Sequence, residues 1–159
     1  MKQMNKKGFT LVELLAVLVI LGLLVTIAVP AATSVSEKAK IKMLKTKTQL
    51  AMQGAILWLQ DNKSAFTSNE LDNCTTSSDN VTTCQMTFMK LATLGQIDFD
   101  YKDDNGIEHV QNPVDKSNLD AAYIIVTYNS LNKSVDALDA CYSAGKSILY
   151  DDNSSSKKC

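Results

Sequence analysis

The fold is decided by residues 7–30, which read KGFTLVELLAVLVILGLLVTIAVP. From Leu14 to Ser36, 23 consecutive residues carry no charge. A helix that rises about 1.5 Å per residue is then roughly 35 Å long and covers the roughly 30 Å hydrocarbon layer of a bilayer. Residues 9–30 are therefore predicted to form a membrane-spanning helix.

Charges around this helix predict its orientation. Lys2, Lys6 and Lys7 precede it, and basic flanks usually stay cytoplasmic, so the carboxyl-terminal part should be exported. The alternative is a cleavable secretory signal peptide with small residues at 29–31. Glu13 argues against that alternative, because a carboxylate at bilayer depth costs about 3 kcal/mol and needs a partner.

The stretch from Lys7 to Leu15 resembles the processing motif of the type IV prepilin family, which includes type II secretion pseudopilins and competence pilins. The resemblance covers residues 6–30 of 159. It implies that residues 1–8 are a leader peptide, that the prepilin peptidase cuts between Gly8 and Phe9, and that the new amine of Phe9 is methylated. It also implies an α+β fold, in which a long amino-terminal helix packs on a small antiparallel β-sheet domain.

Assembly of a filament is also implied by the resemblance. The mature helix would form the filament core, and Glu13 would pair with the amine of Phe9 in its own chain, at i+4 spacing, or in a neighbouring subunit. Gly22 and Pro30 stand where the family often has helix-weakening residues, and proline removes a backbone hydrogen bond. The implied partners are further copies in a helical homo-oligomer, other pilins, the prepilin peptidase, the pilus assembly platform protein and the membrane. No cofactor is implied.

The net charge of −1 hides a division along the chain. Residues 1–60 hold eight Lys and two Glu, or +6, whereas residues 61–159 hold eight Lys and fifteen acids, or −7. With no Arg and little aromatic interleaving, no specific nucleic-acid partner is predicted. The basic residues after the membrane segment are interpreted in two ways. They form a solvated face near lipid headgroups, or they attract the acidic half of a neighbouring subunit: Lys38, Lys40, Lys42, Lys45 and Lys47.

Residues 31–60 are predicted to continue the helix as an amphipathic stalk, because they lack Pro and contain only Gly54. Helical spacing gives two apolar stripes. The first stripe comprises Val35, Ala39, Met43, Thr46, Leu50, Gly54 and Leu57. The second stripe comprises Ile41, Leu44, Thr48, Ala51, Ala55 and Trp58. Either both stripes pack against the globular part of the same chain, or one of them faces another subunit.

Residues 61–159 are predicted to form an exported globular domain with a small antiparallel sheet. The pattern predicts a loop over 69–83, a helix over 86–94, a hairpin of 97–101 and 107–110 turning at Asn105-Gly106, and strands over 121–128 and 147–150. Residues 135–142 are ambiguous between helix and strand.

The four cysteines all lie in this domain, which predicts disulfides in an exported protein. Three pairings are open; proximity favours Cys74 with Cys84 and Cys141 with Cys159. A zinc site is not expected, because no close Cys-x-x-Cys pair is present. Many pilins bound a variable carboxyl-terminal loop with a disulfide, which the second pair resembles.

Two further interpretations of this domain concern a metal site and an enzymatic site. The acidic run Asp98, Asp100, Asp103, Asp104 and Glu108 invites calcium, which major pseudopilins carry in an acidic loop, but its spacing does not fit an EF-hand. A solvated acidic hairpin explains the same residues, so no metal is predicted. His109 is the single histidine, and no G-x-S-x-G, H-E-x-x-H or phosphate loop is present.

The sequence thus predicts a non-enzymatic pilin of a type IV pilus that serves adhesion, motility or uptake. Its precursor would cross the cell membrane once, amino terminus inside, before joining an extracellular pilus. The alternative is a pseudopilin of a type II secretion system or a competence pilin. A membrane-tethered exported enzyme is the alternative from another class.

Overall fold

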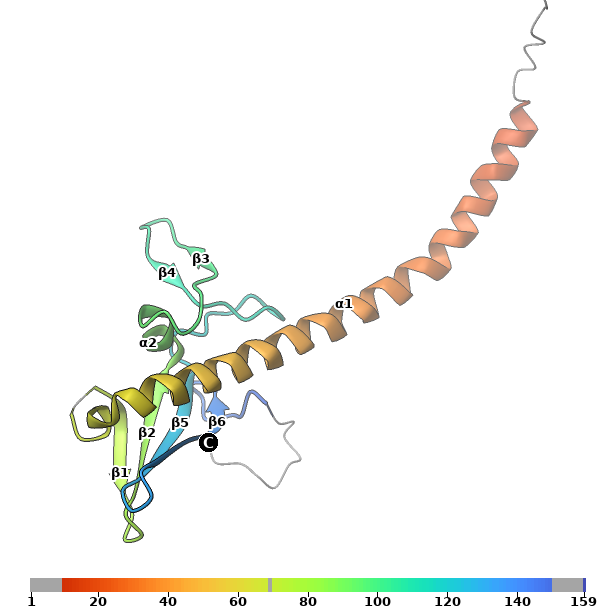
Figure 1. Cartoon of the computed structure of the whole chain (residues 1–159). Helices are drawn as coiled ribbons and strands as arrows, with labels where there is room; N and C mark the ends of the chain where they lie inside the picture. Colours follow the sequence, from red (N-terminus) through yellow and green to blue (C-terminus); the bar gives the residue numbers. More distant parts are fainter. Residues whose placement is uncertain (1–9, 69, 150–158) are drawn as a thin grey trace, which may run out of the picture. The chain divides into compact units, whose positions relative to one another are not determined.

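The computed structural model describes residues 10–68, 70–149 and 159, without the side chains of residues 27–33. The chain divides into two compact units, residues 1–39 and residues 40–159. Helix α1 (Leu11–Asp61) contributes to both units, and every strand belongs to the second (Figure 1).

The first unit consists of the amino-terminal part of α1. Its described apolar side chains are exposed, from 82% at Leu11 to 49% at Val17. The helix passes Gly22 and Pro30 without interruption. Among the described residues, no helix has both the length and the apolar character that crossing a membrane requires.

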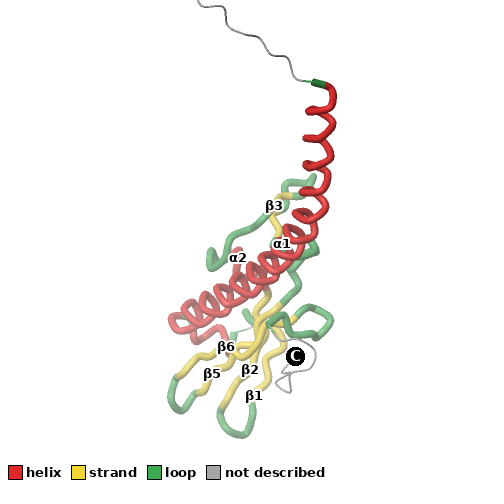
Figure 2. Tube along the Cα trace, turned by 90° about the vertical axis from the view of Figure 1, so that its right-hand side faces the viewer, coloured by secondary structure: helices red, strands yellow, loops and turns green. Residues whose placement is uncertain are grey.

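The second unit is built on a four-stranded antiparallel sheet. Its strands are β1 (Asp72–Thr76), β2 (Val81–Thr87), β5 (Tyr123–Asn129) and β6 (Ser134–Cys141), in the spatial order β1-β2-β5-β6 (Figure 2). The central pair is in register from Val81 opposite Asn129 to Thr87 opposite Tyr123. β5 is buried at Ile124 and Val126, as its β-branched composition predicts.

The carboxyl-terminal part of α1 packs against the sheet. Its buried residues recur at three- and four-residue intervals, which places them on one helix face: Leu44, Thr48, Ala51, Ala55 and Leu59. They share a core with Met86, Phe88 and Ile124. Thr48, the one hydroxyl in the row, donates to the Leu44 carbonyl at 2.9 Å and so is not left unpaired. The predicted α+β architecture, a helix on a small antiparallel sheet, is confirmed.

Two short helices lie beside the sheet: η1 (Lys63–Phe66) and α2 (Phe88–Thr93). The Thr87 hydroxyl caps α2 by accepting from the Lys90 backbone amide. Gly95, at φ +70°, ends the helix in a conformation that favours glycine. The predicted helix over 86–94 is therefore shorter than expected, because residues 86 and 87 belong to β2.

The acidic hairpin forms as β3 (Tyr101–Lys102) and β4 (Glu108–His109). It turns where the Asn-Gly pair predicts, and Gly106 takes a φ of +80°. The first strand is shorter than the predicted 97–101. Asp100 accepts instead from the Gln111 backbone amide at 2.6 Å, which fixes the segment before β3 outside the regular ladder.

Three other predictions are corrected or resolved. Residues 69–83, predicted as a loop, contain β1 and the start of β2; β1 was missed because its five residues are all exposed and four of them are polar. The ambiguous residues 135–142 form β6 through Cys141. The predicted strand over 147–150 is only an isolated bridge between Ser147 and Cys141, and Tyr150 lies outside the described residues.

Candidate functional site

The carboxylate of Glu13 is engaged at the start of α1. Its Oε2 accepts from both the backbone amide and the hydroxyl of Thr10, each at 2.9 Å, while the Glu13 amide donates to the Thr10 hydroxyl at 3.3 Å. Thr10 is the residue before the first helical position, so this reciprocal pair is a capping box. The Thr-x-x-Glu spacing could have predicted it, but the role of Thr10 was missed.

Several predicted site residues lie beyond what the structure describes. The leader of residues 1–8, the Gly8–Phe9 bond and the amine of Phe9 all fall outside the described residues. The predicted pairing of Glu13 with that amine is therefore untested. Gly22 has no heavy atom within 4 Å of the position a side chain would take, apart from its own helix and chain neighbours.

The second unit presents an exposed apolar row on α1. Met43, Leu50 and Leu57 lie seven residues apart and are 60%, 56% and 62% exposed. They are members of the first stripe, whereas the buried face carries most of the second stripe. The first stripe is thus exposed at these three residues, so the two stripes do not both pack along their whole length against the globular part of this chain.

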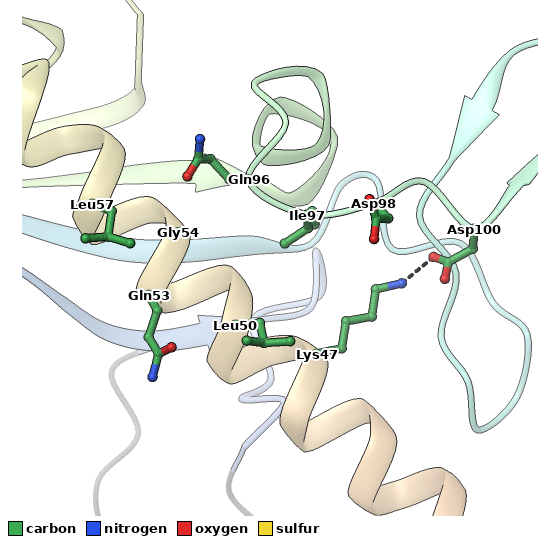
Figure 3. A pocket seen from close by; sticks show the side chains of 9 residues that line it. All are labelled: Lys47, Leu50, Gln53, Gly54, Leu57, Gln96, Ile97, Asp98 and Asp100. Carbon is green, nitrogen blue, oxygen red and sulfur yellow. Dashed lines mark hydrogen bonds and ion pairs between the residues drawn. The ribbon is translucent and has the colours of Figure 1, made fainter.

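A groove of about 460 Å³ runs beside the exposed row, between α1 and the segment that leads into β3 (Figure 3). Leu50, Leu57 and Ile97 give it apolar walls. Gly54 forms part of its floor, and a Cβ there would come within 2.9 Å of the Gln96 Cβ. The glycine therefore permits the segment after α2 to lie directly on the helix.

An ion pair closes one end of the groove. Lys47 forms an ion pair with Asp100 and also donates to the Gln111 carbonyl at 3.1 Å. Four more lysines of the predicted basic face are exposed and form no ion pair with described residues: Lys38, Lys40, Lys42 and Lys45. Among the described residues, Lys47 is thus the one member of the basic face that an ion pair neutralises.

Three carboxylates of the acidic run, Asp100, Asp103 and Glu108, are engaged within the chain. Asp103 accepts from the amides of Asn105 and Ile107 at 2.9 and 2.8 Å, and Glu108 pairs with Lys102 at 3.0 Å. These turn bonds to Ile107 and Asn105 lower the pKa of Asp103. In the described part of the chain, the one cluster of three potential metal ligands is Asp139, Cys141 and Cys159.

The two cysteines of that cluster are bonded to each other. Cys141 is bonded to Cys159, and Cys74 is bonded to Cys84, which are the two pairings that proximity favoured. Disulfide sulfurs carry no thiolate to bind a metal. Asp139, only 1% exposed, accepts from the Ala140 amide at 2.7 Å and the Ser147 hydroxyl at 2.8 Å. This buried carboxylate, which sequence reasoning missed, fixes residue 147 beside β6.

Comparison with known proteins identifies the amino-terminal segment. Residues 3–29 match the family described as the prokaryotic N-terminal methylation motif, the signature of type IV pilins and prepilins. No curated protein and no solved structure gives a significant match to the chain.

Proposed function

We propose that this chain, which carries the type IV prepilin signature over residues 3–29, is a pilin, the structural subunit of a type IV pilus. Its precursor is held in the cell membrane by the apolar helix, amino terminus inside, and loses residues 1–8 to the prepilin peptidase. The mature chain then enters a helical filament through the assembly platform and serves adhesion, motility or uptake. The single observation that carries the proposal is the methylation motif.

The amino-terminal part of α1 supports this function. Eleven of its large apolar side chains between Leu11 and Leu24 are exposed, and no described part of the chain covers them. Such a surface is stable in lipid or against other helices, and not in water. A filament core made of these helices would bury them, and Glu13 would exchange its bonds to Thr10 for the amine of a neighbouring subunit.

The second unit offers a further exposed apolar surface for assembly. The row of Met43, Leu50 and Leu57 repeats every seven residues, the spacing at which a second helix packs along a seam. We assign this row and the groove beside it to contact with another copy of the chain. The described part of the chain holds no apolar element packed on the row, so a neighbouring subunit is the occupant that the polymer supplies.

The experiment that tests the proposal is mass spectrometry of protein sheared from the cell surface. We expect intact chains that begin at methylated Phe9 and contain both disulfides. Soluble, unassembled molecules that begin near Ala32 would instead indicate a cleaved secretory signal peptide and would contradict the proposal.

A pseudopilin or a competence pilin would share this processing, so a second measurement separates the functions. Deletion of the gene should remove surface filaments and leave protein secretion unchanged if the chain is a pilin. The Cys141–Cys159 disulfide near the carboxyl end favours the pilin, because many pilins bound their variable loop in this way. Loss of secretion with filaments retained would favour the pseudopilin.

A further inference from the structure

His109 joins two parts of the second unit through both nitrogens of its ring. Nδ1 lies 2.6 Å from an Asp120 carboxylate oxygen, and Nε2 lies 3.6 Å from an Asp103 carboxylate oxygen. Asp103 begins the exposed turn between β3 and β4, whereas Asp120 lies in the loop that leads to β5. The imidazole, with a side chain 17% exposed, therefore connects the hairpin turn to the loop.

The two contacts require hydrogens on different nitrogens of the ring. Asp120 is held in place independently, since its Oδ1 accepts from the Val110 backbone amide at 2.8 Å, and its Oδ2, the oxygen that His109 contacts, also accepts from the Asn118 side-chain amide at 2.9 Å. A hydrogen on Nδ1 serves the Asp120 contact in both charge states of the ring. The Asp103 contact needs a hydrogen on Nε2 as well, and only the protonated imidazolium carries both.

We propose that His109 is a pH-operated clip: the imidazolium ties the β3–β4 turn at Asp103 to Asp120, and loss of the Nε2 proton releases the turn while the bond to Asp120 stays. The neutral ring would turn a lone pair toward the Asp103 carboxylate, which is repulsive. Two other groups face the ring: the Asn118 side-chain amide, whose nitrogen lies 3.3 Å from Nδ1, and Tyr101, stacked at a centroid distance of 5.1 Å. The aromatic face of Tyr101 also favours the imidazolium cation.

The electrostatics give the direction of the pH effect. The hydrogen bond to Asp120 is the main cause that raises the pKa of His109 above its ordinary 6.5, the contact with Asp103 adds to it, and partial burial opposes it. A group whose pKa is raised on folding contributes full stability below its unfolded pKa and loses it as the pH rises through the folded pKa. The turn is therefore held at and below pH 6.5 and released above it, once the pH passes the folded pKa. The clip also fails in strong acid, because the pKa values of Asp103 and Asp120 are lowered and these groups protonate only there.

The test is NMR on the full chain in detergent micelles. The imidazole pKa is measured by titration, and amide exchange protection of Ile107, which donates to Asp103 at 2.8 Å, is followed against pH. Ile107 protection should fall by up to about tenfold for each unit by which the folded pKa exceeds the ordinary value. The Val110 amide, bound to Asp120, is the internal control and should keep its protection.

Two variants complete the experiment. Asp103→Asn keeps an oxygen for the Ile107 amide but removes the charge, so it should lower the His109 pKa and abolish the pH dependence at Ile107. Asp104→Asn, at the exposed neighbouring position, is the matched control and should change neither. A wild-type His109 pKa at or below 6.5, or Ile107 protection that is independent of pH, would overturn the proposal.

Discussion

Glu13 is the residue on which the proposed assembly depends. In the structure its carboxylate bonds to Thr10, the residue that caps its own helix. Pairing with the amine of a second subunit would therefore be an exchange of partners rather than the rescue of an unpaired charge. The sequence predicted an acid in need of a partner, and the intrachain partner follows from the Thr-x-x-Glu spacing.

Substitution of Glu13 separates processing from assembly. We expect Glu13→Ala to leave cleavage after Gly8 largely intact but to prevent incorporation into filaments, because the arriving subunit would lack the carboxylate. Cleavage is read from the mass of membrane-bound protein, and incorporation from the sheared fraction.

Thr10→Ala is the matched control for this variant. It removes the hydroxyl of the capping box but leaves the carboxylate free to pair between subunits, so filaments should still form. Normal filament yield from Glu13→Ala, or equal loss from both variants, would show that the carboxylate acts only as a helix cap.

At the level of elements, α1 was the most predictable part, and β1 the least. The composition of residues 31–60 predicted both the helix and its two stripes, but which stripe would be buried depends on the sheet and cannot be read from one helix alone. β1 was missed because its polar side chains show no alternation; it pairs with β2 and is tied to it by the Cys74–Cys84 disulfide. The groove was likewise unpredictable, because it requires the segment at Gln96 to lie on Gly54.

The exposed row on α1 gives a prediction for assembly. Leu50→Glu should abolish or strongly reduce filaments, since a charge buried in a helix seam is costly. The same variant should leave the second unit folded, because Leu50 is 56% exposed in the subunit. Shearing yields and circular dichroism of the purified chain measure the two effects.

Gln49→Glu introduces the same charge at the adjacent exposed position, about 100° around the helix, and should assemble normally. If both variants assemble as well as the natural chain, the row is not a subunit contact.

For the whole molecule, stability rests on a modest core reinforced by covalent bonds. The disulfides close loops with sequence separations of 10 and 18, and each should contribute about 3 kcal/mol by limiting the unfolded chain. Their pairing was favoured by proximity in sequence, whereas the burial of Asp139 beside Cys141 could be found only from the structure.

Paired substitution of either disulfide tests this contribution. Cys74→Ser with Cys84→Ser, or Cys141→Ser with Cys159→Ser, should each lower the free energy of unfolding by about 3 kcal/mol. Urea unfolding can be followed by fluorescence of Trp58, the single tryptophan, which is partly buried against the core. A loss below about 0.5 kcal/mol for both pairs would contradict a stabilising role, since small surface effects are of that size.

The polar edge strand β1 limits how copies of this molecule can associate through their sheet edges. Its five exposed side chains and the register shift between Asp72 and Thr75 interrupt the flat row of backbone groups that unprotected sheet edges offer. On the opposite edge, the Ile148 amide already donates to the Ala140 carbonyl at 2.7 Å. Pairing of strands between the sheet edges of two copies is thereby disfavoured at both margins, so many subunits can crowd together without joining into amyloid-like aggregates.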